Sequence, residues 1–290
     1  MIKVAPPSSP KKILVADDDR ALRSMLTSML ERAGFSVTGA ADGAEALAHI
    51  KHRKFDLVLL DVWMPNMTGL EVLARVKDKP GRPKVIVMTG DNTPETLLNA
   101  VREQAYQYVN KPFSAKGVVE MVERALASEA GPPIEVLSAR PEWIELLVPC
   151  EREAAERIQD FLLQAKSDLP QEVREAVGQA FRELLLNAIE WGGDLDPNQK
   201  VRISCLRTRR MVLYRIADPG RGFKFEGLTH AATSNPPDSP IDHLRVRDEK
   251  GLRPGGFGIL LTRAVVDELL YNEAQNEVAF VKYLDGGPKS

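Results

Sequence analysis

Residues 13–19 read ILVADDD, a short apolar run that ends in three consecutive aspartates. A continuous apolar run of this length is typical of a strand buried on both faces of a parallel sheet. Apolar residues then recur at helical spacing from Ala21 to Ala33, and Gly34 supplies a helix stop. The sequence therefore predicts a buried strand that is followed by a helix.

The same strand–helix unit recurs four more times up to about residue 128. The predicted strands and helices of these repeats are 35–40 and 43–52, 56–60 and 69–77, 84–88 and 94–103, and 106–109 and 114–127. Such an alternation predicts an α/β domain with a doubly wound, flavodoxin-like parallel sheet. Ligand sites of such sheets lie at the carboxyl ends of the strands.

Reactive side chains fall at those strand ends. They are Asp17, Asp18 and Asp19 after the first strand, Asp61 after the third, Thr89 after the fourth and Lys111 after the fifth. Converging carboxylates favour a hard divalent cation such as Mg²⁺. A hydroxyl and an ammonium opposite them are suited to hold phosphoryl oxygens while a carboxylate attacks in line. An Asp at a strand end can also cap the next helix, and we expect Asp19 to do so.

Four blocks of sequence resemble the signature segments of CheY-like response-regulator receivers. The blocks are ILVADDD at 13–19, LDVWMPNMTG at 60–69, MTG at 88–90 and VNKPF at 109–113. The resemblance covers residues 12–128. It implies that a histidine kinase phosphorylates Asp61, and that Asp18, Asp61 and the backbone carbonyl of Trp63 ligate Mg²⁺, with Asp17 acting through water.

The same resemblance assigns roles to the other strand ends. Thr89 and Lys111 would bind the phosphoryl group, and the Lys111–Pro112 bond would be cis. Tyr108 stands where such receivers place an aromatic that turns inward as Thr89 moves; the alternative is an ordinary surface aromatic at a strand end. We expect the indole of Trp63 to lie at the mouth of the site and to slow hydrolysis of the aspartyl phosphate.

A second domain follows the linker EAGPP at 129–133, whose Gly and Pro residues break the preceding helix. We expect residues 1–11 to be disordered, the second domain to span 134–285 and a tail to occupy 286–290. The predicted elements are strands at 134–138 and 143–148, helices at 151–166 and 170–191, a hairpin of 201–206 with 211–217, a helix at 259–270, and a hairpin of 271–274 with 277–284.

Three short motifs in the second domain carry its chemistry, in the order Glu183-x-x-x-Asn187, Asp218-x-Gly220-x-Gly222 and Gly256-x-Gly258. Residues four apart project side by side from a helix, ordinarily from a solvated face. A lone Asp-x-Gly-x-Gly also occurs in plain turns. Glycines before a helix let backbone N–H groups approach an anion at its positive end.

Together the motifs resemble the N, G1 and G2 boxes of the GHKL ATPases, which have an α/β-sandwich (Bergerat) fold. The resemblance implies bound ATP with Mg²⁺. Its residues would be Asn187 on the Mg²⁺, Asp218 on the adenine amino group, Gly220 and Gly222 beside the base, and Gly256 and Gly258 at the phosphates. The Pro-rich stretch Asn235–Pro240, with the charged run Arg245–Lys250, would form the lid.

Within that superfamily the second domain is most similar to the anti-sigma-factor serine kinases of partner switching. Glu183 would then be the general base for a serine or threonine hydroxyl. Trp191 departs from the family, which often has His at this position. A histidine kinase is not expected, because no helical hairpin with a phosphoacceptor His fits between Ala127 and Ile134.

The overall composition narrows the setting. A formal net charge of −2 gives no general attraction to nucleic acid. Cys150 and Cys205 are too few for a disulfide framework. The N-terminus does not resemble a signal peptide, and no apolar run approaches the ~20 residues that span a bilayer. We therefore expect a cytoplasmic protein that contacts neither nucleic acid nor membrane.

Joined, the two halves predict a two-component response regulator with an ATP-binding output domain. In the first hypothesis, Asp61 phosphorylation controls a serine/threonine kinase that acts on an antagonist (anti-anti-sigma) protein in sigma-factor partner switching. In the second, nucleotide only shapes a binding surface that sequesters a sigma factor or an antagonist. Glu183 favours the enzyme, whereas Trp191 and the atypical lid favour the binding module. A third reading is a scaffold that has lost ATP binding.

Overall fold

The chain divides into two compact units, residues 1–130 and 131–290. The computed structural model describes residues 10–91, 93–128, 131–140, 142–164, 169–222 and 257–285. Within these ranges no helix combines the length and the apolar character that crossing a bilayer requires. Several sequence predictions fall outside them: Gly256, the lid at 235–250, most of the N-terminal tail and the tail at 286–290.

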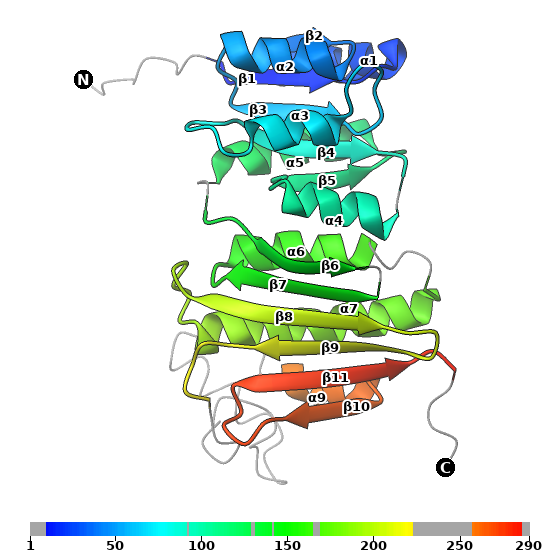
Figure 1. The fold of residues 1–290 in the computed structure, drawn as a ribbon, viewed down its shortest axis with the longest axis vertical. Coiled ribbons are helices and arrows are strands. Elements are labelled where there is room, and N and C mark those ends of the chain that lie inside the picture. Colours follow the sequence, from blue (N-terminus) through cyan, green and yellow to red (C-terminus); the bar gives the residue numbers. More distant parts are fainter. Residues whose placement is uncertain are drawn as a thin grey trace, which may run out of the picture. The chain divides into compact units, whose positions relative to one another are not determined.

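The first unit is built on a five-stranded parallel sheet in the order β2-β1-β3-β4-β5 (Figure 1). Its strands are β1 (Lys12–Ala16), β2 (Ser36–Ala40), β3 (Leu57–Asp61), β4 (Lys84–Thr89) and β5 (Gln107–Asn110). Every residue of β3 is buried, as is all of β4 after its first residue. The predicted doubly wound sheet is therefore confirmed. Its central strands are buried because helices cover both faces of the sheet.

Each strand of this sheet is followed by a helix. The helices are α1 (Arg20–Arg32), α2 (Gly43–His52), α3 (Gly69–Val76), α4 (Pro94–Arg102) and α5 (Ala115–Ala127). Helices α1 and α5 pack on one face, and α2, α3 and α4 lie along the other (Figure 1). Asp19 caps α1 as expected, because its Oδ1 accepts hydrogen bonds from the N–H groups of Ala21 and Leu22 at 2.8 and 3.1 Å.

The second unit is built on a six-stranded sheet in the order β10-β11-β9-β8-β7-β6, in which every neighbouring pair is antiparallel. Its strands are β6 (Glu135–Arg140), β7 (Trp143–Pro149), β8 (Lys200–Arg207), β9 (Met211–Ala217), β10 (Glu268–Tyr271) and β11 (Glu277–Tyr283). Buried residues alternate along β9, as expected when helices cover one face of a sheet.

Among the described residues, α-helices lie on that face of the sheet (Figure 1), and a π-helical turn follows one of them. They are α6 (Arg152–Gln164), α7 (Gln171–Asn187), the π turn η1 (Ala188–Gly192) and α9 (Gly258–Val265). Phe181 of α7 packs on Tyr214 of β9, with ring centroids 5.0 Å apart, and Tyr214 stacks on Phe280 of β11 at 5.1 Å. This aromatic column fixes α7 against the sheet.

For two helices, the predicted C-terminal end was wrong. The α-helix predicted at 170–191 stops at Asn187 and continues as the π turn. The helix predicted at 259–270 stops at Val265, and Glu268–Tyr271 forms the edge strand β10 instead. The apolar run there fits either structure, and hydrogen bonding to β11 decides for the strand. Asp267 begins that pairing, since its N–H donates to the carbonyl of Val281 at 3.0 Å.

Candidate functional site

Three carboxylates gather at the carboxyl edge of the first sheet. Asp17 and Asp18 follow β1, and Asp61 is the last residue of β3. One oxygen from each lies within 4.8 Å of the others. Asp17 and Asp61 are buried while Asp18 is exposed, so the cluster is open to solvent on one side. Such a set of oxygen ligands fits a hard divalent cation that keeps some of its waters.

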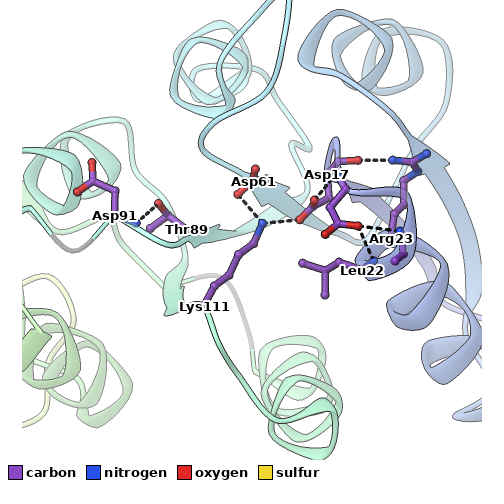
Figure 2. Close-up of polar contacts among 9 residues, drawn as sticks. Asp17, Leu22, Arg23, Asp61, Thr89, Asp91 and Lys111 are labelled. Carbon is purple, nitrogen blue, oxygen red and sulfur yellow. Dashed lines mark hydrogen bonds and ion pairs between the residues drawn. The ribbon is translucent and has the colours of Figure 1, made fainter.

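Lys111 lies across this cluster from the end of β5. Its Nζ is 2.7 Å from Asp17 Oδ2 and 2.9 Å from Asp61 Oδ1 (Figure 2). The Lys111–Pro112 peptide bond is cis, as expected from the sequence. The ammonium therefore offers a fixed positive charge beside the carboxylate of Asp61.

The pKa values of Asp61 and Lys111 depend on burial and on the hydrogen bonds and charges around each group. Burial raises the pKa of Asp61, the hydrogen bond and charge of Lys111 lower it, and the nearby charges of Asp17 and Asp18 raise it further, so that it ends above its ordinary value. Burial lowers the pKa of Lys111, but hydrogen bonds to Asp17 and Asp61 outweigh this effect and raise it. A cation at the cluster would relieve the repulsion among the carboxylates.

Thr89 and Tyr108 meet at one backbone segment next to the cluster. The Thr89 Oγ accepts a hydrogen bond from the Asp91 N–H at 2.9 Å (Figure 2). The Tyr108 hydroxyl donates to the Asp91 carbonyl at 3.0 Å. Tyr108 is buried, only 7% exposed, and not a surface aromatic. Burial, followed by the charge of Asp91, raises its pKa. Thr89 and Tyr108 are thus connected through a single residue.

Asp91 itself was missed by the sequence analysis. Its carboxylate accepts hydrogen bonds from the Thr93 N–H at 3.0 Å and from the Thr96 hydroxyl at 2.9 Å. Burial raises the pKa of Asp91, but these bonds and the nearby side chain of Trp63 lower it below its ordinary value. Trp63, two residues after Asp61, is 57% exposed. No sequence motif signals this contact, because it joins two loops that only the fold brings together.

In the second unit, Asp218 lies at the end of β9 among glycines. Its Oδ1 accepts a hydrogen bond from the Gly220 N–H at 2.8 Å. A Cβ added at Gly192 would overlap the Asp218 carboxyl group, and one added at Gly193 would overlap the sulfur of Cys150. The π turn thus brings bare backbone against Asp218. Gly192 and Gly193 belong to none of the sequence motifs.

The loop after Asp218 is held by the β10–β11 turn. The Asp218 N–H donates to the Asn276 carbonyl at 2.9 Å, and Asn276 Nδ2 donates to the Gly220 carbonyl at 3.0 Å. Gly222 has φ +79°, and a Cβ there would overlap the backbone of Ala274. Burial raises the pKa of Asp218 even though the Gly220 N–H opposes the shift. The result is a partly buried carboxylate in a cradle of glycine backbone, formed by Gly192 and Gly220.

Glu183 and Gly258 are also brought together. A Cβ added at Gly258, the first residue of α9, would lie 2.5 Å from Glu183 Oε2. Asn187 ends α7 one turn after Glu183. The structure therefore brings Glu183 of the first motif against Gly258, the described residue of the third motif. Asp218 of the second motif lies against Gly192, in the π turn that follows Asn187.

Comparison with known proteins identifies both units. Residues 13–123 match the family described as response regulator receiver domain, and residues 149–282 match the histidine kinase-like ATPase domain. The DNA-binding response regulator MtrA of Mycolicibacterium smegmatis is 33% identical over 183 residues, which are 63% of this chain and 78% of MtrA. The chain belongs to the response regulators, and it has a receiver domain followed by a histidine kinase-like ATPase domain.

Two further similarities concern the receiver. The DNA-binding transcriptional regulator NtrC of Azospirillum brasilense is 39% identical over 120 residues, which are 41% of this chain but only 25% of NtrC. A CheY-like receiver protein of Methanospirillum hungatei is 34% identical in a solved structure that covers 41% of this chain and 94% of its own, with a TM-score of 0.39. Both named regulators are described as DNA-binding, whereas residues 149–282 of this chain match an ATPase domain.

Proposed function

We propose that Asp61 is the phosphoacceptor of this response regulator. The observation that carries the proposal is the placement of Lys111 Nζ within 2.9 Å of Asp61 in a cluster of three carboxylates. A cation held by Asp17, Asp18 and Asp61 would neutralise phosphoryl charge when bound. The Asp61 oxygen would attack phosphorus in line, while Lys111 and Thr89 hold the transferred oxygens and the leaving imidazole departs. The backbone carbonyl of Trp63 would complete the ligands.

The acceptor role is tested with a labelled small-molecule phosphodonor and Mg²⁺. Wild-type protein should take up one label per chain, and Asp61→Asn should take up none. A protein that labels equally well after this substitution would refute the assignment. Lys111→Arg keeps the charge but changes its geometry, and it should label more slowly.

For the second unit, the proposed function is an ATP-dependent serine/threonine kinase that acts on an antagonist protein in sigma-factor partner switching. Support comes from Asp218 in its glycine cradle and from the contact of Glu183 with Gly258. Asp218 would accept the adenine amino hydrogen, Gly220 and Gly222 would pass beside the base, and Gly258, together with Gly256, would face the phosphates. Asn187 would coordinate the Mg²⁺ of the nucleotide.

Glu183 is then the general base. It would take the proton of the substrate hydroxyl as that oxygen attacks the terminal phosphorus of ATP. Incubation with labelled ATP and a candidate antagonist should transfer label to the antagonist in wild type and not in Glu183→Gln. The cytoplasm is the compartment in which a histidine kinase, ATP and such an antagonist would meet.

Trp191 favours a second candidate function, a binding module without phosphotransfer. It is 50% exposed in the π turn, and an indole cannot make the polar contacts of the His that the resemblance leads us to expect. In this case ATP would shape a surface that sequesters a sigma factor or antagonist. Tight ATP-dependent binding without label transfer would support the module. A nucleotide titration of wild type against Asn187→Ala would expose a scaffold that no longer binds ATP.

A further inference from the structure

The C-terminal end of α5 is fastened to the first sheet by the side chains of Lys84, Tyr106 and Ser128, which we call the α5 clasp. Lys84 Nζ donates to the carbonyls of Ala125 and Ser128 at 2.7 and 2.8 Å, and lies 2.7 Å from Ser128 Oγ. The Tyr106 hydroxyl lies 2.8 Å from that same Oγ. The Lys84 ammonium also stands 4.5 Å from the centre of the Tyr106 ring.

Part of this arrangement has an ordinary structural explanation. The last carbonyl groups of a helix lack partners within the helix, and a lysine there satisfies them and interacts favourably with the helix dipole. That explanation covers the contact of Lys84 with Ala125. It requires neither the Tyr106 ring nor the hydroxyl of Ser128, so the clasp contains more than a helix cap.

The position of the clasp relates it to the acceptor site. Strand β4 runs from Lys84 to Thr89, and β5 follows Tyr106 directly and carries Tyr108. Thr89 is the last residue of β4 and Tyr108 is the second residue of β5, and both bond to the backbone of Asp91. The same two adjacent strands are therefore linked once through Asp91 and once through the clasp, which joins Lys84 at the start of β4 to Tyr106 just before β5.

The strands between these two ties are stiff. Five of the six residues of β4 are buried, and a strand of this length spans about 20 Å. A close-packed core does not absorb a displacement gradually, and it passes the movement to the next contact. A phosphoryl group that draws the Thr89 hydroxyl toward Asp61 would shift β4 against β5. The separation of Lys84 and Tyr106 would then change.

Ser128 is the residue through which this movement would pass from the receiver domain to the linker. It follows the last residue of α5 and directly precedes the linker at 129–133. We propose that the α5 clasp couples the state of the Asp61 site to the backbone at Ser128, and hence to the linker and the ATPase domain. Lys84 and Tyr106 are positioning residues in this inference, which rests on the phosphoacceptor role proposed for Asp61.

The test is hydrogen exchange on the full chain with Mg²⁺, with and without beryllofluoride as the phosphoryl mimic. In wild type, beryllofluoride should change protection both at 61–69 and at 131–140. Lys84→Met removes the ammonium that bonds to Ala125 and Ser128, so it should keep the change at 61–69 and reduce the change at 131–140 at least about threefold. Lys77→Met, which removes an ion pair with Glu103 outside the clasp, should keep both changes.

Each alternative gives a different pattern. If Lys84→Met raises exchange throughout the domain but keeps the beryllofluoride difference at 131–140, Lys84 is only a cap and the coupling is refuted. The coupling also fails if wild type responds at 61–69 and not at 131–140. No response at 61–69 would instead refute the role of Asp61. Tyr106→Phe keeps the ring and removes one hydroxyl, so it serves if Lys84→Met does not fold; it should weaken the change at 131–140 without abolishing it.

Discussion

Trp63 shows at the residue scale how one side chain can serve two parts of a site. Its indole is exposed two residues after Asp61, and its side chain helps to lower the pKa of Asp91 against the effect of burial. Asp91 also accepts a hydrogen bond from Thr96 in the first turn of α4. Trp63 therefore lies near the residue that bonds to Thr89 and Tyr108.

We predict that Trp63→Asn shortens the lifetime of the aspartyl phosphate, because water reaches it more easily. Trp63→Phe keeps an apolar ring of similar bulk, so it should speed dephosphorylation roughly fivefold or less, and by less than Trp63→Asn does. Decay of labelled protein after removal of the phosphodonor measures both rates. An unchanged rate in Trp63→Asn would show that the indole does not shield the site.

We predict that ionisation of the Asp218 carboxyl group destabilises the second unit, although the charged form is the one that favours nucleotide binding. Its pKa in the folded state lies above the ordinary value of about 3.9, so between these two values the folded chain holds more protons than the unfolded chain. The free energy of unfolding of the second unit should therefore fall as pH rises through this window. Asp218→Asn should abolish that fall and stabilise the unit at neutral pH. Urea denaturation across the acidic range measures this effect.

The same carboxylate should make nucleotide binding depend on pH. The charged form of Asp218 is the better acceptor for an adenine amino group, so affinity should weaken as pH falls through its raised pKa. Asp218→Asn should lose at least about tenfold in affinity at neutral pH, which corresponds to one charge-assisted hydrogen bond. Titration with a fluorescent ATP analogue measures it. Unchanged affinity in Asp218→Asn would remove this residue from the nucleotide site.

At the scale of elements, the π turn after α7 is where the second unit departs from regular structure. π-Helical turns occur frequently at functional sites. Here the turn places Gly192 against the Asp218 carboxyl group and Gly193 against Cys150. A regular α-helix through these residues would present different positions to β9. The turn therefore positions the cradle around Asp218.

The loop after β9 allows a matched pair of glycine substitutions. Gly222 has φ +79° and lies against the backbone of Ala274, whereas Gly34 has φ +93° and open space around it. Gly34→Ala should cost only the backbone strain, about 1–2 kcal/mol. Gly222→Ala should cost more, because the loop must also move away from β10–β11. Thermal unfolding of each unit compares the two, and equal losses would contradict the close approach at Gly222.

At the scale of the whole molecule, the two phosphoryl sites lie on one chain and must obey linkage. If beryllofluoride at Asp61 changes the affinity for ATP by some factor, ATP must change the affinity for beryllofluoride by the same factor. We predict a coupling of roughly 5- to 150-fold, the range typical of allosteric proteins. Two reciprocal titrations measure it, with Asp61→Asn as the uncoupled control. Equal affinities in all states would mean that the domains act independently.

Much of the molecule could be predicted from its sequence. The repeated strand–helix pattern determined the parallel sheet, because buried strands and amphipathic helices differ in the period of their apolar residues. The strand ends located Asp17, Asp61, Thr89 and Lys111, because parallel strands bring their carboxyl ends to one edge. The order of three motifs also indicated the ATPase domain.

Only the tertiary structure decided the contacts between distant segments. Residues 268–270 were predicted as the end of a helix, and pairing with β11 makes them part of the strand β10, which spans Glu268–Tyr271. The proximity of Trp63 to Asp91, the glycines around Asp218 and the α5 clasp leave no local pattern in the sequence. Each depends on where two separate loops or element ends meet in space, whereas periodicity and motif spacing report only on residues that are neighbours along the chain.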